Sequence, residues 1–429
     1  MTDAFERIRV LWPDHLGLAR GKYIPARLAS RGVRHCTGVW ALGYDRNMTP
    51  GTPGSNLEGG LPDMDATFDV GDIRPGWEPG VGVVVADLQR HGDTVAVSPR
   101  AALRKAIADW QALGLTPMVG IELEAYLLEP DGHGGWRPLD APGSFVYGTG
   151  PSVDPHGVIE DIWRAADAAG IPLESVNSEY DTPQFEFTIE YRDALRSADD
   201  AFLFKVLARE IAQSKGLLCT FMGKPLSDRG GSGTHFNVSF NGPDGGNAIH
   251  DASAEDGLSA LARRCIAGLL AHHRALAGLC APTVNAYKRL QPASLSGYWA
   301  NWGYDHRAAT VRIPPERGAA TRLEHRLADG AAPAHVAMAA ILQAARLGSV
   351  HELVAPPPET GDGMEEVNTD VCCPASLGDA LDALVADEAL VEAVGAELVS
   401  QHVTVKRTEW QRFVTATTDW ERNEYLPFL

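Results

Sequence analysis

The chain has 429 residues, of which 45% are hydrophobic and 22% are charged, so it contains enough apolar material for a globular core. Its formal net charge of -19 argues against binding to nucleic acid or to anionic membranes, because both partners are themselves negative. No apolar run approaches the roughly 20 residues that a membrane span needs, and the charged N-terminus does not resemble a signal peptide. The six cysteines contain no C-x-x-C pair, so we expect free thiols and a cytoplasmic protein.

The N-terminal part of the chain is predicted to be a small β-rich domain. Residues 8–12 and 81–87 are typical of apolar strands, and residues 48–61 form a long loop rich in Gly and Pro. A helix start follows, with Ser98 as the N-cap and a proline at the first helical position. The predicted domains are therefore 1–97 and 98–429.

Residues 119–128 read V-G-I-E-L-E-A-Y-L-L and alternate as a strand does. Glu122, Glu124 and Tyr126 fall on one face, opposite an apolar face. Two carboxylates on one strand face lie roughly 6.5–7 Å apart, since each residue rises about 3.3 Å. They would repel each other unless cations lie beside them. The alternative is an edge strand with one solvated face.

The rest of the chain alternates between strand and helix patterns. Residues 131–135 read as a hairpin turn, and 217–221 and 234–240 as strands around a glycine loop. The adjacent His272 and His273 have no obvious ligand partners and are expected at the surface. Helical periodicity predicts helices near 98–113, 155–169, 193–215, 258–279, 333–347, 376–400 and 408–422.

Three further strands repeat the pattern of a polar face opposite an apolar one. Gln184 and Glu186 share a face in Q-F-E-F, and His235 shares a face with Asn237 and Ser239 in T-H-F-N-V-S-F. In R-L-E-H-R-L the polar face carries arginine, glutamate and arginine. If these strands line one cavity, it contains Glu122, Glu124, Glu186, Glu324, His235, Arg322 and Arg326, with Glu179 close by.

This combination of side chains is suited to divalent cations and an anion. Several carboxylates and one histidine suit Mg²⁺ or Mn²⁺, whereas arginines are suited to phosphate or carboxylate. Metal ions and arginines around an anion are typical of active sites that catalyse phosphoryl transfer. No G-x-x-x-x-G-K-[ST] motif is present, so a P-loop is not expected. An ion-pair network at the rim of a barrel would produce the same residue pattern.

Six segments together resemble the glutamine synthetase family, in family order, over about residues 98–429. They read G-I-E-L-E from Gly120, E-Y-D-T-P-Q-F-E from Glu179, K-P-L-S-D-R-G-G-S-G-T-H from Lys224, N-A-Y-K-R-L from Asn285, H-R-A-A-T-V-R-I-P from His306 and R-L-E-H-R-L-A-D from Arg322. The resemblance implies an α+β protein with an N-terminal β-grasp domain and a catalytic domain whose antiparallel strands form a funnel surrounded by helices. It also implies a homo-oligomer, typically a dodecamer.

The same resemblance implies two divalent ions, Mg²⁺ or Mn²⁺, with ATP as co-substrate. The ion nearer the amino acid would be held by Glu124, Glu179 and Glu186. The ion nearer ATP would be held by Glu122, His235 and Glu324. The substrate carboxylate would be bound by Arg289 and Arg326, beside Gly231. The phosphates would face Arg307, Arg312 and Arg322, and the nucleotide would face Glu174 and Ser239. Among these, the expected catalytic residues are Arg307, Glu324 and Arg326.

The sequence departs from the ammonia-using members of that family. Leu295 stands at the loop position where they carry an acidic residue that helps deprotonate ammonium, and no D-G-S-S segment is present. Asn237 replaces the second histidine of an H-x-H pair, and Gly230 replaces the asparagine that opens the glycine loop. Residues 361–377 contain no tyrosine.

These departures predict a ligase that uses an amine other than ammonia. Ammonium needs negative charge to be held and to lose its proton, whereas Leu295 can only pack against carbon. The expected reaction joins the γ-carboxylate of glutamate, through γ-glutamyl phosphate, to an amine with an apolar part. Tyr298, Trp299 and Trp302 are candidates for the pocket wall, although burial in the core would explain them equally well. The alternatives are an inactive structural or regulatory relative and a metal-dependent isomerase or hydrolase.

Overall fold

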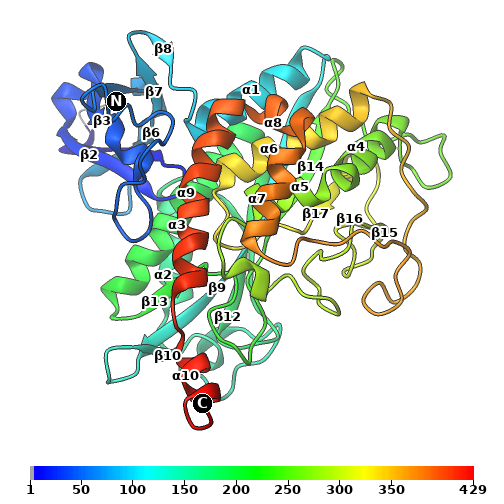
Figure 1. Cartoon of the computed structure of the whole chain (residues 1–429). Coiled ribbons are helices and arrows are strands. Elements are labelled where there is room, and N and C mark those ends of the chain that lie inside the picture. The colour runs from blue at the N-terminus through cyan, green and yellow to red at the C-terminus, as the bar shows by residue number, and fades with distance from the viewer. Residues whose placement is uncertain (1–3) are drawn as a thin grey trace.

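The computed structural model describes residues 4–429, and its N-terminal part contains two small sheets. One has the strand order β2-β1-β6-β5 and the other has the order β3-β4-β7-β8. Both lie in the blue to cyan part of Figure 1. Their strands are β1 (Arg7–Pro13), β2 (Ala19–Pro25), β3 (Val33–Cys36), β4 (Asp63–Thr67), β5 (Arg74–Pro75), β6 (Val81–Val85), β7 (Asp87–Arg90) and β8 (Asp93–Thr94).

These two sheets enclose a core of their own. Ile8, Val10 and Trp12 lie on one face of β1 and are at most 1% exposed, because alternate strand residues point to the same side. They pack with Val84 and Leu88 in a cluster that is separate from the larger core of the chain. The predicted β-rich character of this part is therefore confirmed.

The remaining strands build one nine-stranded sheet around a long central strand, β9. The order is β11-β12-β9-β14-β17-β16-β15, and β10 and β13 pair with β9 outside this path. Since β9 has neighbours on both sides, the solvated edge strand is the wrong interpretation. The bounds are β9 (Thr116–Pro130), β10 (Trp136–Pro138), β11 (Leu173–Ser178), β12 (Gln184–Asp193), β13 (Leu218–Thr220), β14 (Thr234–Asn241), β15 (Trp302–Tyr304), β16 (Val311–Ile313) and β17 (Leu323–His325).

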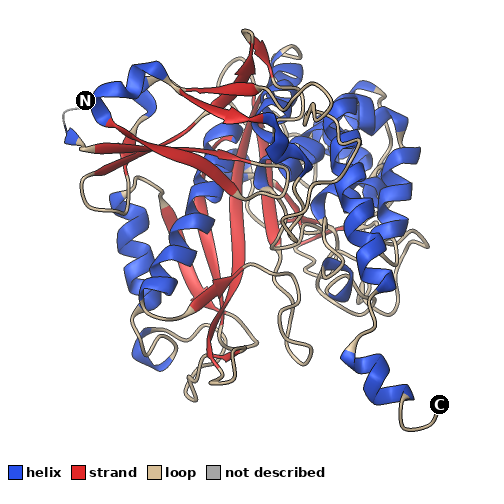
Figure 2. Ribbon diagram, turned by 60° about the vertical axis from the view of Figure 1, so that its left-hand side comes forward, coloured by secondary structure: helices blue, strands red, loops and turns tan. Residues whose placement is uncertain are grey.

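Ten α-helices in the described residues accompany the large sheet. Figure 2 shows helices on the outside of the strands. Helix α3 packs on β9 and β12, and α1 and α4 pack on the buried helix α6. The bounds are α1 (Pro99–Gln111), α2 (Val158–Ala168), α3 (Ala194–Ser214), α4 (Ala260–Ala271), α5 (His273–Cys280), α6 (Ala334–Val350), α7 (Leu377–Ala386), α8 (Glu388–Val394), α9 (Ala396–Thr415) and α10 (Asp419–Tyr425).

Three of the helices expected from the sequence are interrupted, and the 408–422 pattern is divided at residues 416–418, between α9 and α10. The 258–279 pattern is divided at His272, whose Nδ1 lies 2.6 Å from Asp387 Oδ2. His273 is fully buried and close to Cys373, so the predicted surface location of this histidine is wrong. The 376–400 pattern is divided into α7, α8 and the start of α9. The first break is at Asp387, which caps α8, and the second is at Gly395, whose φ of 128° stops a helix.

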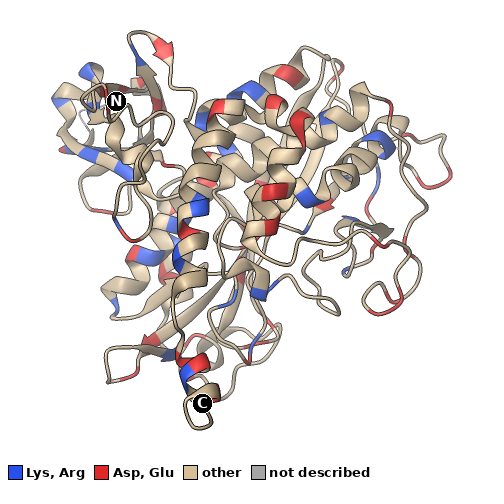
Figure 3. Cartoon of the chain, viewed as in Figure 1, with Lys and Arg blue, Asp and Glu red and all other residues tan. Residues whose placement is uncertain are grey.

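The elements confirm the predicted α+β class, with strands central and helices outside. No helix within residues 4–429 combines the length and apolarity needed to cross a membrane. Acidic and basic side chains are spread over the outer helices and loops (Figure 3). All six cysteines are free, as predicted.

Candidate active site

Strand register brings the four polar faces together in the large sheet. β12, β9, β14 and β17 are consecutive neighbours. Glu124 lies opposite Glu186, Glu122 opposite His235, and Glu324 opposite Asn237. Directly opposed residues on antiparallel strands have Cβ atoms about 4.5–5.5 Å apart, so the pairs face one another on the same side of the sheet. The side chains of these four strands therefore gather on one side of the sheet, as the repeated polar faces predicted.

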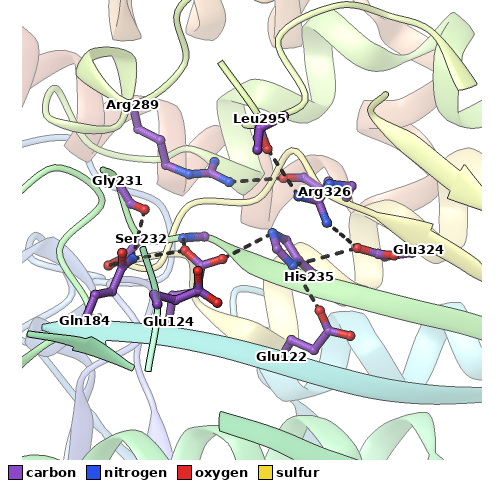
Figure 4. Close-up of polar contacts among 12 residues, drawn as sticks. Glu122, Glu124, Gln184, Gly231, Ser232, His235, Arg289, Leu295, Glu324 and Arg326 are labelled. Atoms are coloured by element: carbon purple, nitrogen blue, oxygen red, sulfur yellow. Dashed lines mark hydrogen bonds and ion pairs between the residues drawn. The ribbon is translucent and has the colours of Figure 1, made fainter. Parts of the chain in front are cut away.

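Two groups of side chains in the described residues have ligand atoms within 4.8 Å of one another. One is Glu122, His235 and Glu324, which is the set expected near ATP. The other is Glu124, Glu186 and His235. His235 is shared, because its Nδ1 lies 3.0 Å from Glu122 Oε2 and its Nε2 lies 3.6 Å from Glu124 Oε1 (Figure 4).

Glu179 is not part of either group. Its carboxylate accepts hydrogen bonds from Asn177 Nδ2 at 3.2 Å and from the backbone amide of Tyr180 at 3.4 Å. Burial and the charge of Glu124 raise its pKa, so it lies within electrostatic range of the acids. The structure thus places Glu179 at the margin of the cluster.

The acids differ in how the protein balances their charge. Burial and the charges of Glu122 and Glu124 raise the pKa of Glu186 to about 9. Burial also acts on Glu122, but hydrogen bonds from His235 and Asn237 outweigh it and hold the Glu122 pKa at about 2. Glu186 is therefore the acid that the protein itself compensates least, and added positive charge would relieve this repulsion.

Glu324 connects the acids to the arginines. It is 1% exposed, accepts a bond from Arg312 Nη1 at 2.6 Å and also accepts one from Arg326 Nη1. Arg326 Nη2 donates to the backbone oxygen of Leu295 at 3.3 Å, and its buried Nε has no partner among residues 4–429. A buried guanidinium with an unused donor is suited to binding an anion.

Arg289 lies against the glycine loop of residues 230–233. It is 7% exposed, and it donates to the backbone oxygens of Leu327 at 3.1 Å and Arg326 at 3.2 Å. A Cβ at Gly231 would lie 2.7 Å from Arg289 Cγ, so only glycine fits there without a shift. Burial lowers the Arg289 pKa, and Glu124 and Asp329 oppose that effect.

The residues expected to face the nucleotide are more open. Arg322 bonds Asn237 Oδ1 at 3.2 Å and Glu316 at 3.0 Å, whereas Arg307 is exposed in the loop between β15 and β16. Ser239 lies on β14, on the face of His235, and Glu174 is exposed on β11. Arg322 therefore joins the cluster, while Arg307 and Glu174 make no hydrogen bond to it within residues 4–429.

Two polar side chains of the site were not among the candidate ligands expected from the sequence. Gln184 is 4% exposed and its Nε2 lies 3.2 Å from Glu124 Oε2, and Asn237 Nδ2 donates to Glu122 Oε1 at 2.9 Å. Both residues share the polar face of their strands with proposed ligands. The period of two had placed both on the polar faces beside Glu186 and His235, but it gave neither of them a role in the site.

Among the candidate pocket aromatics, Trp302 belongs to the core. It is 2% exposed and donates to the backbone oxygen of Pro356 at 2.7 Å. Tyr298 and Trp299 stack edge to face, with ring centroids 4.9 Å apart. Leu295 is 50% exposed and only its backbone oxygen contacts Arg326, so its side chain is accessible.

The donor atoms fit divalent ions and ATP. Carboxylates with one imidazole are suited to Mg²⁺ or Mn²⁺, and soft cysteine ligands are absent from both groups. The unused Arg326 donor and the exposed Arg307 suit an anion. The arrangement is thus equipped to bind cations between acids and a phosphate beside arginines.

Comparison with known proteins agrees with this chemistry. A family model described as the catalytic domain of glutamine synthetase matches residues 96–425. Glutamine synthetase from Methanocaldococcus jannaschii is 32% identical over 443 residues, which cover 98% of this chain and 94% of that protein. The chain belongs to the glutamine synthetase family. It is a carbon–nitrogen ligase, and ligases of this family use ATP and divalent metal ions.

One similar protein has methylamine in its name. Glutamate–methylamine ligase from Methyloversatilis universalis is 35% identical over 445 residues, covering 97% of this chain and 95% of that protein. The solved structure of apo GmaS has a TM-score of 0.86 and 30% identity, covering 98% of this chain and 97% of that one. The mixed α+β fold is thus the fold of a glutamine synthetase-like protein.

Proposed function

We propose that this ligase joins the γ-carboxylate of glutamate to an amine other than ammonia, one with an apolar part. The observation that carries the proposal is Leu295, an accessible aliphatic side chain whose backbone is bonded to Arg326. A leucine cannot attract ammonium or accept its proton, but it can pack against an alkyl group. Similarity to a relative named glutamate–methylamine ligase also supports an amine with an apolar part as the substrate.

The proposed reaction has two steps. A γ-carboxylate oxygen of glutamate attacks the γ-phosphorus of ATP, the bond to the bridging oxygen breaks, and ADP leaves. The neutral amine then attacks the acyl carbon of γ-glutamyl phosphate, phosphate leaves with its bonding electrons, and the nitrogen gives up one proton to water. In this scheme Arg289 and Arg326 hold the α-carboxylate, and Arg307, Arg312 and Arg322 face the phosphates.

The proposed ion ligands are the two sets expected from the family. Glu124, Glu179 and Glu186 would hold one ion, and Glu122, His235 and Glu324 the other. Bound ions would neutralise the phosphate charge and align the triphosphate. Clustering of Glu122, His235 and Glu324, and of Glu124 with Glu186, supports these sets. Glu174 and Ser239 are proposed to contact the nucleotide, and Gly231 the amino acid.

Three broader expectations remain proposals. We propose a division into domains at residues 97 and 98, a homo-oligomer that is a dodecamer as is typical of the family, and a cytoplasmic location. The separate cores of the N-terminal sheets and the large sheet support the first. The six free thiols support the last.

A panel of amines tests the proposed function. Purified protein with ATP, Mg²⁺ and glutamate receives ammonium, methylamine, propylamine, isobutylamine, ethanolamine or putrescine, one at a time. Phosphate release is measured together with the mass of the product. We expect γ-glutamyl amides from the alkylamines, little glutamine from ammonium, and little product from putrescine, whose second charge lacks an acidic partner at Leu295.

The panel also separates the alternatives. No turnover with any amine, together with no calorimetric binding of ATP or Mg²⁺, would indicate an inactive structural or regulatory relative. Product formation without ATP consumption would indicate an isomerase or hydrolase. Efficient glutamine formation from ammonium would contradict the assignment based on Leu295. Glu324→Ala serves as the catalytically impaired control.

A further inference from the structure

Two side-chain amides each contact one carboxylate of the acid cluster. Gln184 lies on β12 beside Glu124, and Asn237 lies on β14 beside Glu122. A neutral amide next to a carboxylate supplies a donor without cancelling its charge, so the carboxylate stays available to a cation. The two amides therefore orient acids that an arginine or lysine would neutralise.

Gln184 joins Glu124 to the glycine loop (Figure 4). Its Nε2 lies 3.2 Å from Glu124 Oε2, 3.0 Å from the backbone oxygen of Gly231 and 3.2 Å from Ser232 Oγ. The backbone amide of Gly233 donates to the same Glu124 oxygen at 2.8 Å. Glu124 Oε2 thus receives two donors, which leaves Oε1 to face His235.

The loop that Gln184 contacts is fixed from other directions as well. Tyr126 Oη donates to the backbone oxygen of Gly230 at 2.9 Å, and the backbone amide of Gly230 donates to Asp181. Within this network, Gln184 alone contacts a proposed ion ligand through its side chain and also the Gly231 carbonyl. Its loss would remove the side-chain link between Glu124 and the Gly231 carbonyl, while the bond from the Gly233 amide to Glu124 and the other contacts of the loop stay in place.

Asn237 has the corresponding position on the other side. Its Nδ2 donates to Glu122 Oε1 at 2.9 Å, and its Oδ1 accepts from Arg322 Nε at 3.2 Å. Glu122 Oε2 lies 3.0 Å from His235 Nδ1. One amide therefore connects an acid of the first ligand group to an arginine proposed to face the phosphates.

We propose that Gln184 and Asn237 are positioning residues that divide the site between the two substrates. Gln184 couples Glu124 to the loop that receives the amino acid, and Asn237 couples Glu122 to the arginine that receives the nucleotide. The assignment of substrates to the two sides rests on the proposed function. The division of the contacts rests on the geometry alone.

Removal of each amide should weaken one ligand and spare the other. Hydrogen bonds to charged groups are strong enough that loss of one changes binding about tenfold or more. We expect Gln184→Leu to raise the dissociation constant of glutamate by about tenfold and that of the magnesium complex of AMPPNP by less than about threefold. Asn237→Leu should produce the reverse, and isothermal titration calorimetry measures both.

Conservative variants and a surface control complete the experiment. Asn237→Asp keeps the oxygen that accepts from Arg322, so it should bind AMPPNP better than Asn237→Leu. Gln184→Glu places a second carboxylate against Glu124 and should be no better than Gln184→Leu. Gln213→Leu, on the exposed side of α3, should leave both constants unchanged. Thermal unfolding of each variant shows whether its fold is retained.

Binding of Mn²⁺, followed by electron paramagnetic resonance, separates this proposal from the proposed function. Each Leu variant should weaken one class of Mn²⁺ site about tenfold and leave the other, even if glutamate is not the acid substrate. Equal weakening of both classes, or of both substrates, by each folded variant would overturn the division. Unchanged binding in both variants would overturn the positioning roles.

Discussion

The two halves of the site differ in how completely the protein holds them. On the side proposed for the amino acid, Arg289 and Arg326 are 7% and 6% exposed and are bonded to backbone oxygens or to Glu324. On the side proposed for the nucleotide, the Arg312 side chain is 13% exposed and bonded to Glu324, but the Arg322 side chain is 33% exposed and Arg307 is exposed. Both arginines of the first side are thus buried, whereas two of the three on the second side are open to solvent.

This difference has a physical consequence for specificity. A buried guanidinium has lost most of its hydration, so a ligand that pairs with it poorly is rejected strongly. An exposed guanidinium remains hydrated and discriminates less. The account therefore predicts strict selection of the acid substrate and a nucleotide side that becomes ordered when the triphosphate binds.

The largest effect is expected at Glu324, which contacts both halves. Glu324→Ala leaves Arg312 and Arg326 without their shared carboxylate and removes a proposed ion ligand. Because removing one partner of a buried ion pair costs about 3–5 kcal/mol, we expect at least about a 10²-fold loss of ATP-dependent product formation. Steady-state kinetics with the best amine of the panel measures it.

Two further variants serve as controls for Glu324→Ala. Glu324→Gln preserves the size of the side chain and should be nearly as inactive if charge and metal binding are what matter. Glu392→Ala removes an exposed glutamate from α8 and should leave activity unchanged. Activity within tenfold of wild type in folded Glu324→Ala would show that the metal assignment is wrong.

The next prediction compares one arginine from each half. Arg289→Lys replaces a planar fork that makes two backbone bonds, so we expect about a 100-fold fall in kcat/KM for glutamate and a lower Tm. Arg307→Lys should lower turnover with ATP without changing Tm, because its side chain is exposed. Kinetics and thermal unfolding of both variants would show whether the buried arginine contributes to stability and the exposed arginine does not.

A smaller effect is expected at Leu295. Leu295→Glu introduces a charge where an alkyl group is proposed to pack, so kcat/KM for an alkylamine should fall about tenfold. Ammonium use should improve relative to that amine. Leu295→Met is the matched control and should retain the alkylamine. Improved use of the alkylamine by Leu295→Glu would discredit the pocket.

The smallest prediction concerns packing behind the buried half. A Cβ on Gly223 would lie 1.6 Å from Asp329 Oδ2, and Asp329 is fully buried. Gly223→Ala should therefore lower the free energy of unfolding by about 1–3 kcal/mol. At Gly143 the nearest atom to an added Cβ is 3.5 Å away, so Gly143→Ala should cost much less. Denaturant unfolding compares the two, and equal costs would contradict the packing argument.

Strand periodicity predicted much of the buried half from the sequence. The alternation in residues 119–128 placed Glu122 and Glu124 on one face, and β12, β14 and β17 supplied the other polar faces as expected. The alternation could not predict the register between strands. This register pairs Glu122 with His235 and makes His235 common to both ligand groups. Register depends on residues far apart in the chain.

The location of one histidine and the ends of two helices could not be predicted from local sequence patterns. His273 was expected at the surface because the His272-His273 pair has no obvious ligand partners in the sequence, yet α5 buries it near Cys373, which is 100 residues away. The helix ends at Asp387 and Gly395 interrupt a continuous apolar periodicity that predicted one long helix. In both cases tertiary contacts and capping decided the outcome.

The most direct test of the central claim is a competition between two amines in one reaction. Wild-type protein receives ATP, Mg²⁺, glutamate and equal concentrations of ammonium and propylamine at a pH where both are mostly protonated, and the products are separated by mass. The account predicts that γ-glutamylpropylamide exceeds glutamine by at least about tenfold. A product mixture dominated by glutamine would contradict it.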